Sequence, residues 1–190
     1  MQQAEATRRL RLHRPVALVG MMGSGKSAVG RTLAARLGLP LLDTDAALEE
    51  AAQASIAEIF ARDGEAFFRD REHEVLSRLL SGPPTIISTG GGAFMAERNR
   101  TMIHDRGISV WLDAALETLW ERVRHKRTRP LLNGPDPKGT LAALYEARVP
   151  VYALADLAVE SAAGYSLETT ASKVIEALLT RPDVLSEEAR

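Results

Sequence analysis

A glycine-rich segment carries the clearest chemistry in this sequence. Residues 20–27 read GMMGSGKS and match the P-loop pattern G-x-x-x-x-G-K-[ST] at every position. Backbone N–H groups of such a loop surround phosphate oxygens, and the start of the following helix adds positive partial charge. Lys26 can reach the β- and γ-phosphates of a nucleotide, and the Ser27 hydroxyl can bind Mg²⁺. The segment therefore predicts a site for ATP and Mg²⁺.

Two carboxylates follow the next apolar run. Asp43 and Asp45 stand two residues apart and would face the same way in an extended segment. Beside a P-loop, one could hold Mg²⁺ through water. The other could accept a hydrogen bond from a substrate hydroxyl and help to remove its proton. The alternative is structural: Asp45 caps a helix and Asp43 is solvated.

Two further groups of residues suit a small anionic substrate. Gly90, Gly91 and Gly92 follow an apolar run and would let backbone N–H groups approach a ligand, although a flexible turn is the alternative. Arg69 and Glu72 are three residues apart on an expected helix, where the carboxylate can hold the guanidinium in place for an anion. A solvated surface pair is the alternative there.

A cationic run extends from Arg122 to Lys138 and enters a loop rich in proline and glycine, with a lid expected at residues 124–138 that includes Arg129 directly before Pro130. Clustered positive charge in such a segment is typical of a lid that closes over phosphates, with a solvated loop as the alternative. RNA binding is disfavoured because no aromatic residues interleave with the charges. Arg148 lies further on, just before an expected rigid turn at Pro150.

These residues need a scaffold that brings them together, and the hydrophobic pattern predicts one. Short apolar runs typical of buried parallel strands alternate with helical patterns, which indicates an α/β fold with helices on both faces of the sheet. Ligands in such folds bind beyond the carboxyl ends of the strands, where the candidate residues lie. Strands are expected at residues 16–19, 40–42, 85–88, 108–112 and 157–160. Helices are expected at residues 26–37, 46–52, 55–62 (with a Ser55/Glu58 capping box), 65–80, 97–106, 116–124, 140–147 and 167–179.

The composition fits one ordinary globular domain, with 190 residues of which 45% are hydrophobic and 26% charged. We expect the domain at residues 15–181, after a flexible N-terminal extension at residues 1–14 and before a polar tail at residues 182–190. The net charge of −1 gives no global attraction to nucleic acid or to an anionic membrane. The absence of cysteine excludes thiolate catalysis and fits the cytosol. No apolar run approaches the roughly 20 residues of a membrane span.

In their order along the chain, these residues resemble the shikimate kinase family over about residues 16–179. The matching strings are GMMGSGKSAVGRTLA at residues 20–34, LLDTD at 41–45, DGEAFFRDRE at 63–72, STGGGA at 88–93, RPLL at 129–132 and YEARVPVY at 145–152. The resemblance implies ATP-dependent phosphorylation of the shikimate 3-hydroxyl, in the pathway to chorismate and the aromatic amino acids. It also implies a P-loop kinase fold whose five parallel strands are ordered 2-3-1-4-5. A cytoplasmic monomer without a nucleic-acid or membrane partner is expected.

The same resemblance implies a role for each candidate residue. The ATP phosphates would be held by Gly23, Ser24, Gly25, Lys26, Ser27, Ala28 and, from the lid, Arg129. Mg²⁺ would be bound by Ser27 and, through water, by Asp43. Shikimate would be bound by Asp45, Arg69, Gly90, Gly91, Gly92 and Arg148, with Glu72 orienting Arg69. Catalysis would depend on Asp45 as the base, on Lys26 and on Arg129. Ala28 departs from the family, which usually has threonine at this position.

Two other functions stay open from the sequence. One is a P-loop kinase for another small hydroxylated acid such as gluconate; the triple glycine and the two arginines, Arg69 and Arg148, favour shikimate over it. The other is a non-catalytic nucleotide-binding module, which the intact P-loop and acidic pair disfavour.

Overall fold

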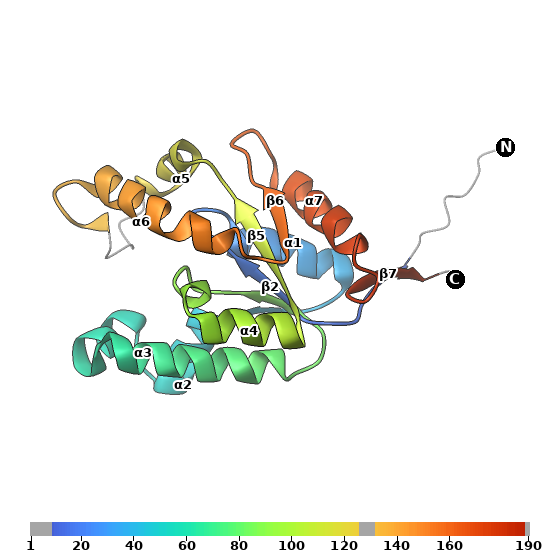
Figure 1. Cartoon of the computed structure of the whole chain (residues 1–190), viewed down its shortest axis with the longest axis horizontal. Helices are drawn as coiled ribbons and strands as arrows, with labels where there is room; N and C mark the ends of the chain where they lie inside the picture. The colour runs from blue at the N-terminus through green and yellow to red at the C-terminus, as the bar shows by residue number, and fades with distance from the viewer. Residues whose placement is uncertain (1–8, 126–131, 189–190) are drawn as a thin grey trace.

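The computed structural model describes residues 9–125 and 132–188. A five-stranded parallel sheet runs through its centre in the order β3-β4-β2-β5-β6 (Figure 1). The strands are β2 (Val16–Val19), β3 (Leu41–Asp43), β4 (Ile86–Ser88), β5 (Ile108–Asp113) and β6 (Leu157–Glu160). Counted along the chain within this sheet, the order is the predicted 2-3-1-4-5, which confirms the α/β P-loop kinase architecture.

Helices cover both faces of this sheet. They are α1 (Lys26–Leu37), α2 (Thr44–Ala52), α3 (Ile56–Leu80), the short 3₁₀ helix η1 (Ala93–Met95), α4 (Glu97–Arg106), α5 (Leu116–Val123), α6 (Pro137–Tyr152) and α7 (Leu167–Leu179). Side chains of α1 and α7 share one apolar cluster with the sheet, and side chains of α3, α4, α5 and α6 share the other. No helix in the described part of the chain is long and apolar enough to cross a bilayer.

The sequence of the central strand, β2, is apolar at every position because both of its faces are buried. Val16 and Leu18 belong to the cluster under α1 and α7, whereas Ala17 and Val19 belong to the opposite cluster. All four side chains are 0% exposed. Because the P-loop follows β2 directly, the phosphate site begins at a strand that is anchored on both faces.

The helices predicted at residues 55–62 and 65–80 form one kinked element, α3. Gly64 has φ 81° and ψ 173°, outside the helical region, and divides α3 into two segments. The predicted capping box is confirmed: Ser55 Oγ accepts the Glu58 N–H at 3.2 Å, and Glu58 Oε2 accepts the Ser55 N–H at 2.7 Å. Residues from both sides of the kink pack with α2 in a third apolar cluster.

Helix α6 is longer than the predicted residues 140–147. Asp136 caps its first turn, and the helix continues through Pro150 to Tyr152. The rigid turn predicted after Arg148 is therefore wrong. Pro150 has no N–H to donate to the backbone oxygen four residues earlier, so the last turn of α6 lacks one helical hydrogen bond.

The chain ends differ from the predicted flexible extension at residues 1–14 and polar tail at residues 182–190. Strands β1 (Arg9–Leu12) and β7 (Leu185–Glu188) form a two-stranded antiparallel sheet in which Leu12 pairs with Leu185. Both leucines are buried in the cluster under α1 and α7. The predicted boundaries at 15 and 181 are therefore wrong, because the folded domain includes β1 and β7.

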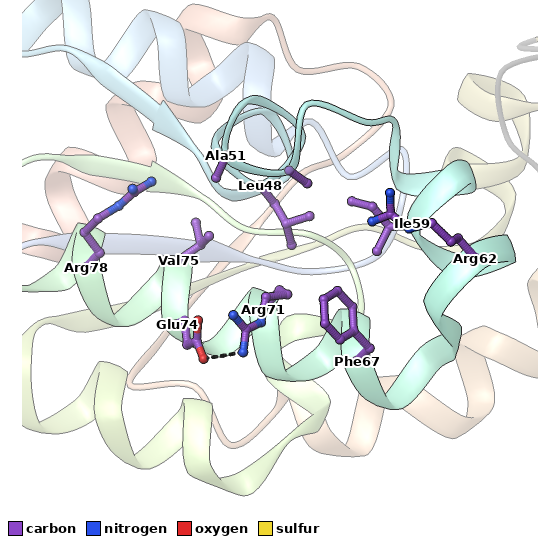
Figure 2. Close-up of a pocket in the computed structure, with 10 residues that line it drawn as sticks. Leu48, Ala51, Ile59, Arg62, Phe67, Arg71, Glu74, Val75 and Arg78 are labelled. Carbon is purple, nitrogen blue, oxygen red and sulfur yellow. Dashed lines mark ion pairs between the residues drawn. The ribbon is translucent and has the colours of Figure 1, made fainter.

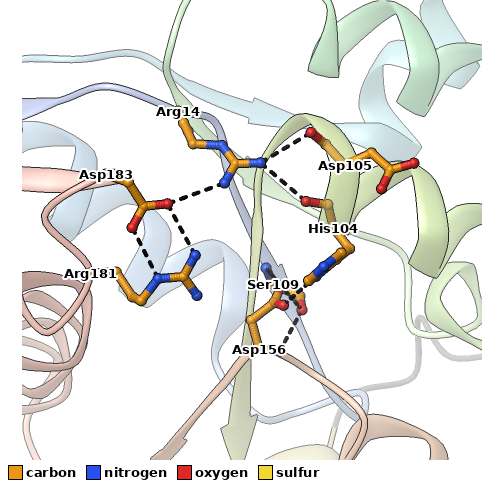
Figure 3. Close-up of polar contacts among 7 residues, drawn as sticks. All are labelled: Arg14, His104, Asp105, Ser109, Asp156, Arg181 and Asp183. Atoms are coloured by element: carbon orange, nitrogen blue, oxygen red, sulfur yellow. Dashed lines mark hydrogen bonds and ion pairs between the residues drawn. The ribbon is translucent and has the colours of Figure 1, made fainter.

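Polar contacts fix these ends to the base of the main sheet (Figure 3). Arg14 Nη1 pairs with Asp183 Oδ2 at 3.3 Å, and Arg14 Nη2 donates to the backbone oxygens of His104 and Asp105, each at 3.1 Å. Arg181 Nε pairs with the same Asp183 at 3.0 Å. The contacts lie at the start of β5, at the opposite end of the sheet from the P-loop, so they brace the fold rather than the phosphate site.

Candidate active site

The P-loop joins β2 to α1 in a conformation that needs its glycines. Gly23 and Gly25 have φ of 81° and 96°, in the left-handed region that favours glycine. A Cβ on Gly23 would also stand 2.7 Å from Val123 Cγ1. Ser24 Oγ is buried and has no hydrogen-bond partner among the described residues. Ala28 lies in the first turn of α1. The loop thus surrounds the amino end of a helix, where the helix dipole attracts phosphate.

The Lys26 ammonium group lies against the backbone of this loop. Its Nζ donates to the backbone oxygens of Gly20 at 2.8 Å and of Met21 at 2.9 Å. The same charge lowers the pKa of Asp45, so the ammonium and that carboxylate are electrostatic neighbours. The structure therefore brings the predicted phosphate-binding lysine close to the predicted base.

Ser27 joins the P-loop to the ends of two strands. Its Oγ lies 3.3 Å from Asp43 Oδ2 at the end of β3 and 3.1 Å from Ser88 Oγ at the end of β4. A hydroxyl and a carboxylate oxygen are hard ligands of the kind that Mg²⁺ prefers. The described residues contain no group of three or more His, Cys, Asp or Glu that could form an all-protein metal site. Mg²⁺ does not require one, because it is usually held by one or two carboxylates together with water and phosphate oxygens.

The two predicted carboxylates have different surroundings. Asp43, and not Asp45, caps α2: its Oδ1 accepts the N–H of Asp45 at 2.9 Å and of Ala46 at 3.0 Å, so the alternative with Asp45 as the cap is wrong. Asp45 lies in the first turn of α2. Burial, followed by the charge of Asp43, raises the pKa of Asp45, while Lys26 and Arg69 lower it by smaller amounts. A carboxylate with a raised pKa accepts a proton more readily than an ordinary aspartate.

Each residue of the triple glycine lies against one of the predicted substrate-binding side chains. A Cβ on Gly90 would stand 2.7 Å from Asp45 Oδ1, and the Gly90 N–H also donates to Thr44 Oγ1 at 3.0 Å. A Cβ on Gly91 would stand 3.4 Å from Arg148 Nη1, and one on Gly92 would stand 2.5 Å from Arg69 Nη2. The glycines therefore make room for a carboxylate and two guanidinium groups.

Arg69 and Glu72 are not the solvated surface pair that the sequence left open. Arg69 Nη1 donates to Glu72 Oε2 at 2.8 Å, and the Glu72 side chain is only 2% exposed. Burial raises the pKa of Glu72, although the hydrogen bond and charge of Arg69 oppose that shift. Because a buried carboxylate holds one end of the guanidinium, Arg69 is fixed in orientation beside Gly92.

Known proteins resemble this chain over most of its length. The shikimate kinase family model matches residues 22–179, which is most of the chain. This chain belongs to the shikimate kinase family. The shikimate kinase of Ruegeria pomeroyi is 63% identical over 174 residues, covering 92% of this chain and 89% of that protein. The shikimate kinase of Cereibacter sphaeroides is also 63% identical, over 175 residues, with 92% and 87% covered.

The fold comparison agrees with the family. A shikimate kinase from Acinetobacter baumannii, solved in complex with shikimate, superposes with a TM-score of 0.82 at 36% identity and covers 88% of this chain and 93% of that one. As a member of the shikimate kinase family, the chain is an ATP-dependent kinase of shikimate. The gluconate kinase and the non-catalytic module that the sequence left open are thereby disfavoured.

One arginine of this shikimate kinase has a role that the sequence analysis missed. Arg122 Nη1 donates to Gly23 O at 3.2 Å and to Ser161 Oγ at 3.1 Å, and its Nη2 donates to Ala162 O at 3.2 Å. Burial lowers the pKa of Arg122. These hydrogen bonds connect the P-loop to the segment after β6. Among the described residues, Arg124, two positions on, has a surface ion pair with Glu121 at 2.9 Å and no contact with the P-loop, so neighbouring arginines differ in a way that local sequence does not reveal.

Tyr152 is a second residue that was missed. It is buried, and its hydroxyl donates to the backbone oxygen of Gly91, which fixes the triple glycine against α6. Burial raises the pKa of Tyr152, and the charge of Arg148 opposes that shift. The available signal was the four-residue spacing from Arg148, which places both side chains on one face of a helix.

The structure describes part of the predicted lid at residues 124–138. Arg129 lies outside the described residues, so its predicted role at the ATP phosphates stays a prediction. At the far end of the segment, Pro137 and Lys138 belong to the first turn of α6 rather than to a loop. Lys138 Nζ pairs there with Glu117 at 3.0 Å.

Proposed function

We propose that this site transfers the γ-phosphoryl group of ATP to the 3-hydroxyl of shikimate. The observation that carries the proposal is the convergence of Asp45, Arg69 and Arg148 on the triple glycine beside the P-loop. A ring with a carboxylate at one end and hydroxyls at the other needs this arrangement: two arginines for the carboxylate, and a carboxylate with backbone N–H groups for the hydroxyls.

In this proposal Arg69 and Arg148 hold the substrate carboxylate. They reach the site from different helices, α3 and α6, so together they fix the orientation of the ring as well as its position. Glu72 orients Arg69 through its 2.8 Å hydrogen bond. Gly90, Gly91 and Gly92 contribute backbone contacts to the substrate.

Asp45 is the proposed base. It accepts a hydrogen bond from the 3-hydroxyl and takes its proton as that oxygen attacks the γ-phosphorus, while the bond from the phosphorus to the bridging oxygen of ADP breaks. Burial and Asp43 raise its pKa, which favours proton transfer near neutral pH. Most of the remaining catalysis is positioning and charge stabilisation, as is usual for phosphoryl transfer.

The phosphates of ATP bind in the P-loop. Gly23, Ser24, Gly25, Lys26, Ser27 and Ala28 surround them. The buried Ser24 hydroxyl, which has no partner among the described residues, supports this assignment because a phosphate oxygen would satisfy it. Arg129 is the proposed lid contact.

Ser27 and Asp43 are the residues that would hold Mg²⁺, Asp43 through a water molecule. When bound, the metal neutralises charge on the β- and γ-phosphates. We also propose, from family membership, that the enzyme acts as a monomer in the cytoplasm without a nucleic-acid or membrane partner.

A coupled assay of ADP release tests the proposal. Purified enzyme with Mg²⁺ and ATP is given shikimate, gluconate or no acceptor, and the product of the shikimate reaction is identified by phosphorus NMR. We expect turnover with shikimate alone and phosphate on the 3-oxygen. Equal ADP release without an acceptor, or phosphate on another oxygen, would contradict the proposed arrangement.

A further inference from the structure

A separate cavity of about 420 Å³ lies between α2 and the kinked α3 (Figure 2). It is lined by residues of α2 and by residues of α3 from both sides of Gly64, so the kink helps to shape it. Arg69 and Glu72, which serve the active site, are not among its lining residues. Its volume lies within the range of roughly 300–1,000 Å³ that is usual for small-molecule sites.

The floor of this α2–α3 cavity is apolar. Leu48 of α2 and Ile59 and Val75 of α3 are buried beneath it. Phe67 forms part of the wall, and this residue is 41% exposed, which is unusually high for a large aromatic residue among those described. An exposed phenyl ring beside a buried apolar floor offers a surface on which a flat ring can stack.

The rim of the cavity is cationic. Arg62, Arg71 and Arg78 line it, against a single lining carboxylate, Glu74. The Arg71 guanidinium lies 5.3 Å from the centre of the Phe67 ring and 2.7 Å from Glu74, so it already stands over the aromatic wall. Arg78 is exposed, and the structure gives it no ion pair with any described carboxylate. Arg62 pairs with Asp63 at 2.7 Å, so it is the charge of Arg78 that favours an anionic occupant.

We propose that the α2–α3 cavity is a second binding site, which takes a small aromatic carboxylate. The ring stacks on Phe67 above the apolar floor, and the carboxylate meets Arg71 and Arg78. This site goes beyond the proposed function, because it lies apart from the substrate clamp and takes part in no step of phosphoryl transfer.

The test must keep the active site filled, because the clamp formed by Arg69 and Arg148 could also bind a carboxylate. Full-length enzyme saturated with shikimate and Mg-ADP is titrated with 3-phenylpropionate by calorimetry. The neutral amide of this probe and the ringless anion propionate are the matched ligands. We expect one molecule of 3-phenylpropionate to bind per chain, about tenfold or more tighter than either matched ligand.

Two kinds of variant test whether the probe binds in the α2–α3 cavity. The double variant Arg71→Gln/Arg78→Gln removes the anion contacts, and Ala51→Trp fills the cavity from an exposed position on α2. We expect each to weaken binding by about tenfold or more. Arg36→Gln and Ala35→Trp, at exposed positions on α1, are the controls for charge and bulk and should bind like the unaltered enzyme.

The proposal is overturned by any of three results. The first is no heat of binding up to about 10 mM probe. The second is competition between the probe and shikimate, which would place the probe in the substrate clamp. The third is unchanged affinity in the folded Arg71→Gln/Arg78→Gln variant. None of these results bears on phosphoryl transfer, which is measured separately by ADP release.

Discussion

The carboxylate of Asp45 lies directly against the backbone of Gly90: a Cβ placed on Gly90 would stand 2.7 Å from Asp45 Oδ1. This contact joins the start of α2 to the segment after β4. Gly90 is therefore needed for space rather than for flexibility, since its φ is not among the positive values. The position of the proposed base, Asp45, therefore depends on the absence of a side chain at Gly90, in the segment after β4.

Substitution of Gly90 by alanine should therefore misplace Asp45 without unfolding the protein. A displacement of about 1 Å can cost on the order of 10²-fold in rate, so we expect a loss of that size in kcat. Gly82→Ala is the matched control, because its Cβ would meet Leu79 O at an ordinary 3.4 Å. Steady-state kinetics and thermal unfolding of both variants check this, and normal turnover in Gly90→Ala would show that the contact is unimportant.

Asp45→Asn should fold normally and lose most of its turnover. An amide cannot take the hydroxyl proton, so we expect kcat to fall by on the order of 10²–10⁴. The measurement is ADP release at saturating substrates, with circular dichroism to verify folding. Near-normal turnover in the folded variant would remove Asp45 from the mechanism.

The pH dependence of the reaction should be sensitive to Glu49. Burial and Asp43 raise the pKa of Asp45, and the charge of Glu49 raises it further. Because the base works when ionised, activity falls as the pH drops through this pKa. Glu49→Gln should lower the pKa of Asp45 and so move the acid limb of kcat/KM to lower pH. The amide oxygen of the glutamine can still accept the Ile56 N–H that Glu49 accepts. Glu50→Gln is the control, and an unmoved limb in Glu49→Gln would argue that another group controls it.

Lys26→Ala and Arg148→Ala should separate the two substrates. The first should weaken ATP use, and the second should mainly lower kcat/KM for shikimate, by roughly 2–4 kcal/mol of transition-state binding. Kinetics with each substrate varied in turn measure both effects, with Arg36→Ala as an exposed control arginine. If Arg148→Ala leaves shikimate use intact, the carboxylate clamp is elsewhere.

The segment at residues 124–138 should respond to ligands as a lid. Its clustered positive charge repels itself in the absence of phosphate, and bound nucleotide compensates that charge. We expect amide hydrogen exchange in the segment to slow when Mg-nucleotide and shikimate are added together. Equal hydrogen exchange in the free and doubly bound enzyme would show that the segment is not a lid, and Arg129 would then be an ordinary surface arginine.

Several features of this enzyme are contained in the sequence itself because they depend on neighbouring residues. The P-loop is one, since its glycine positions and the Lys26–Ser27 pair set its conformation and chemistry within a few residues. The buried strand β2 and the capping box at Ser55 are others, because hydrophobic pattern and local hydrogen bonds determine them. Family resemblance then assigned roles to Asp45, Arg69 and Arg148, and the structure places these three side chains around the triple glycine.

Only the tertiary structure decided the features that join distant residues. The pairing of β1 with β7 connects the two ends of the chain, and Tyr152 meets Gly91 across the active site. The cationic run made Arg122 and Arg124 look equivalent, yet one is held by the P-loop and the other by a surface glutamate. Local pattern reports which face of an element is apolar, but which polar side chain finds a partner depends on how the elements pack, and packing is set by the whole chain.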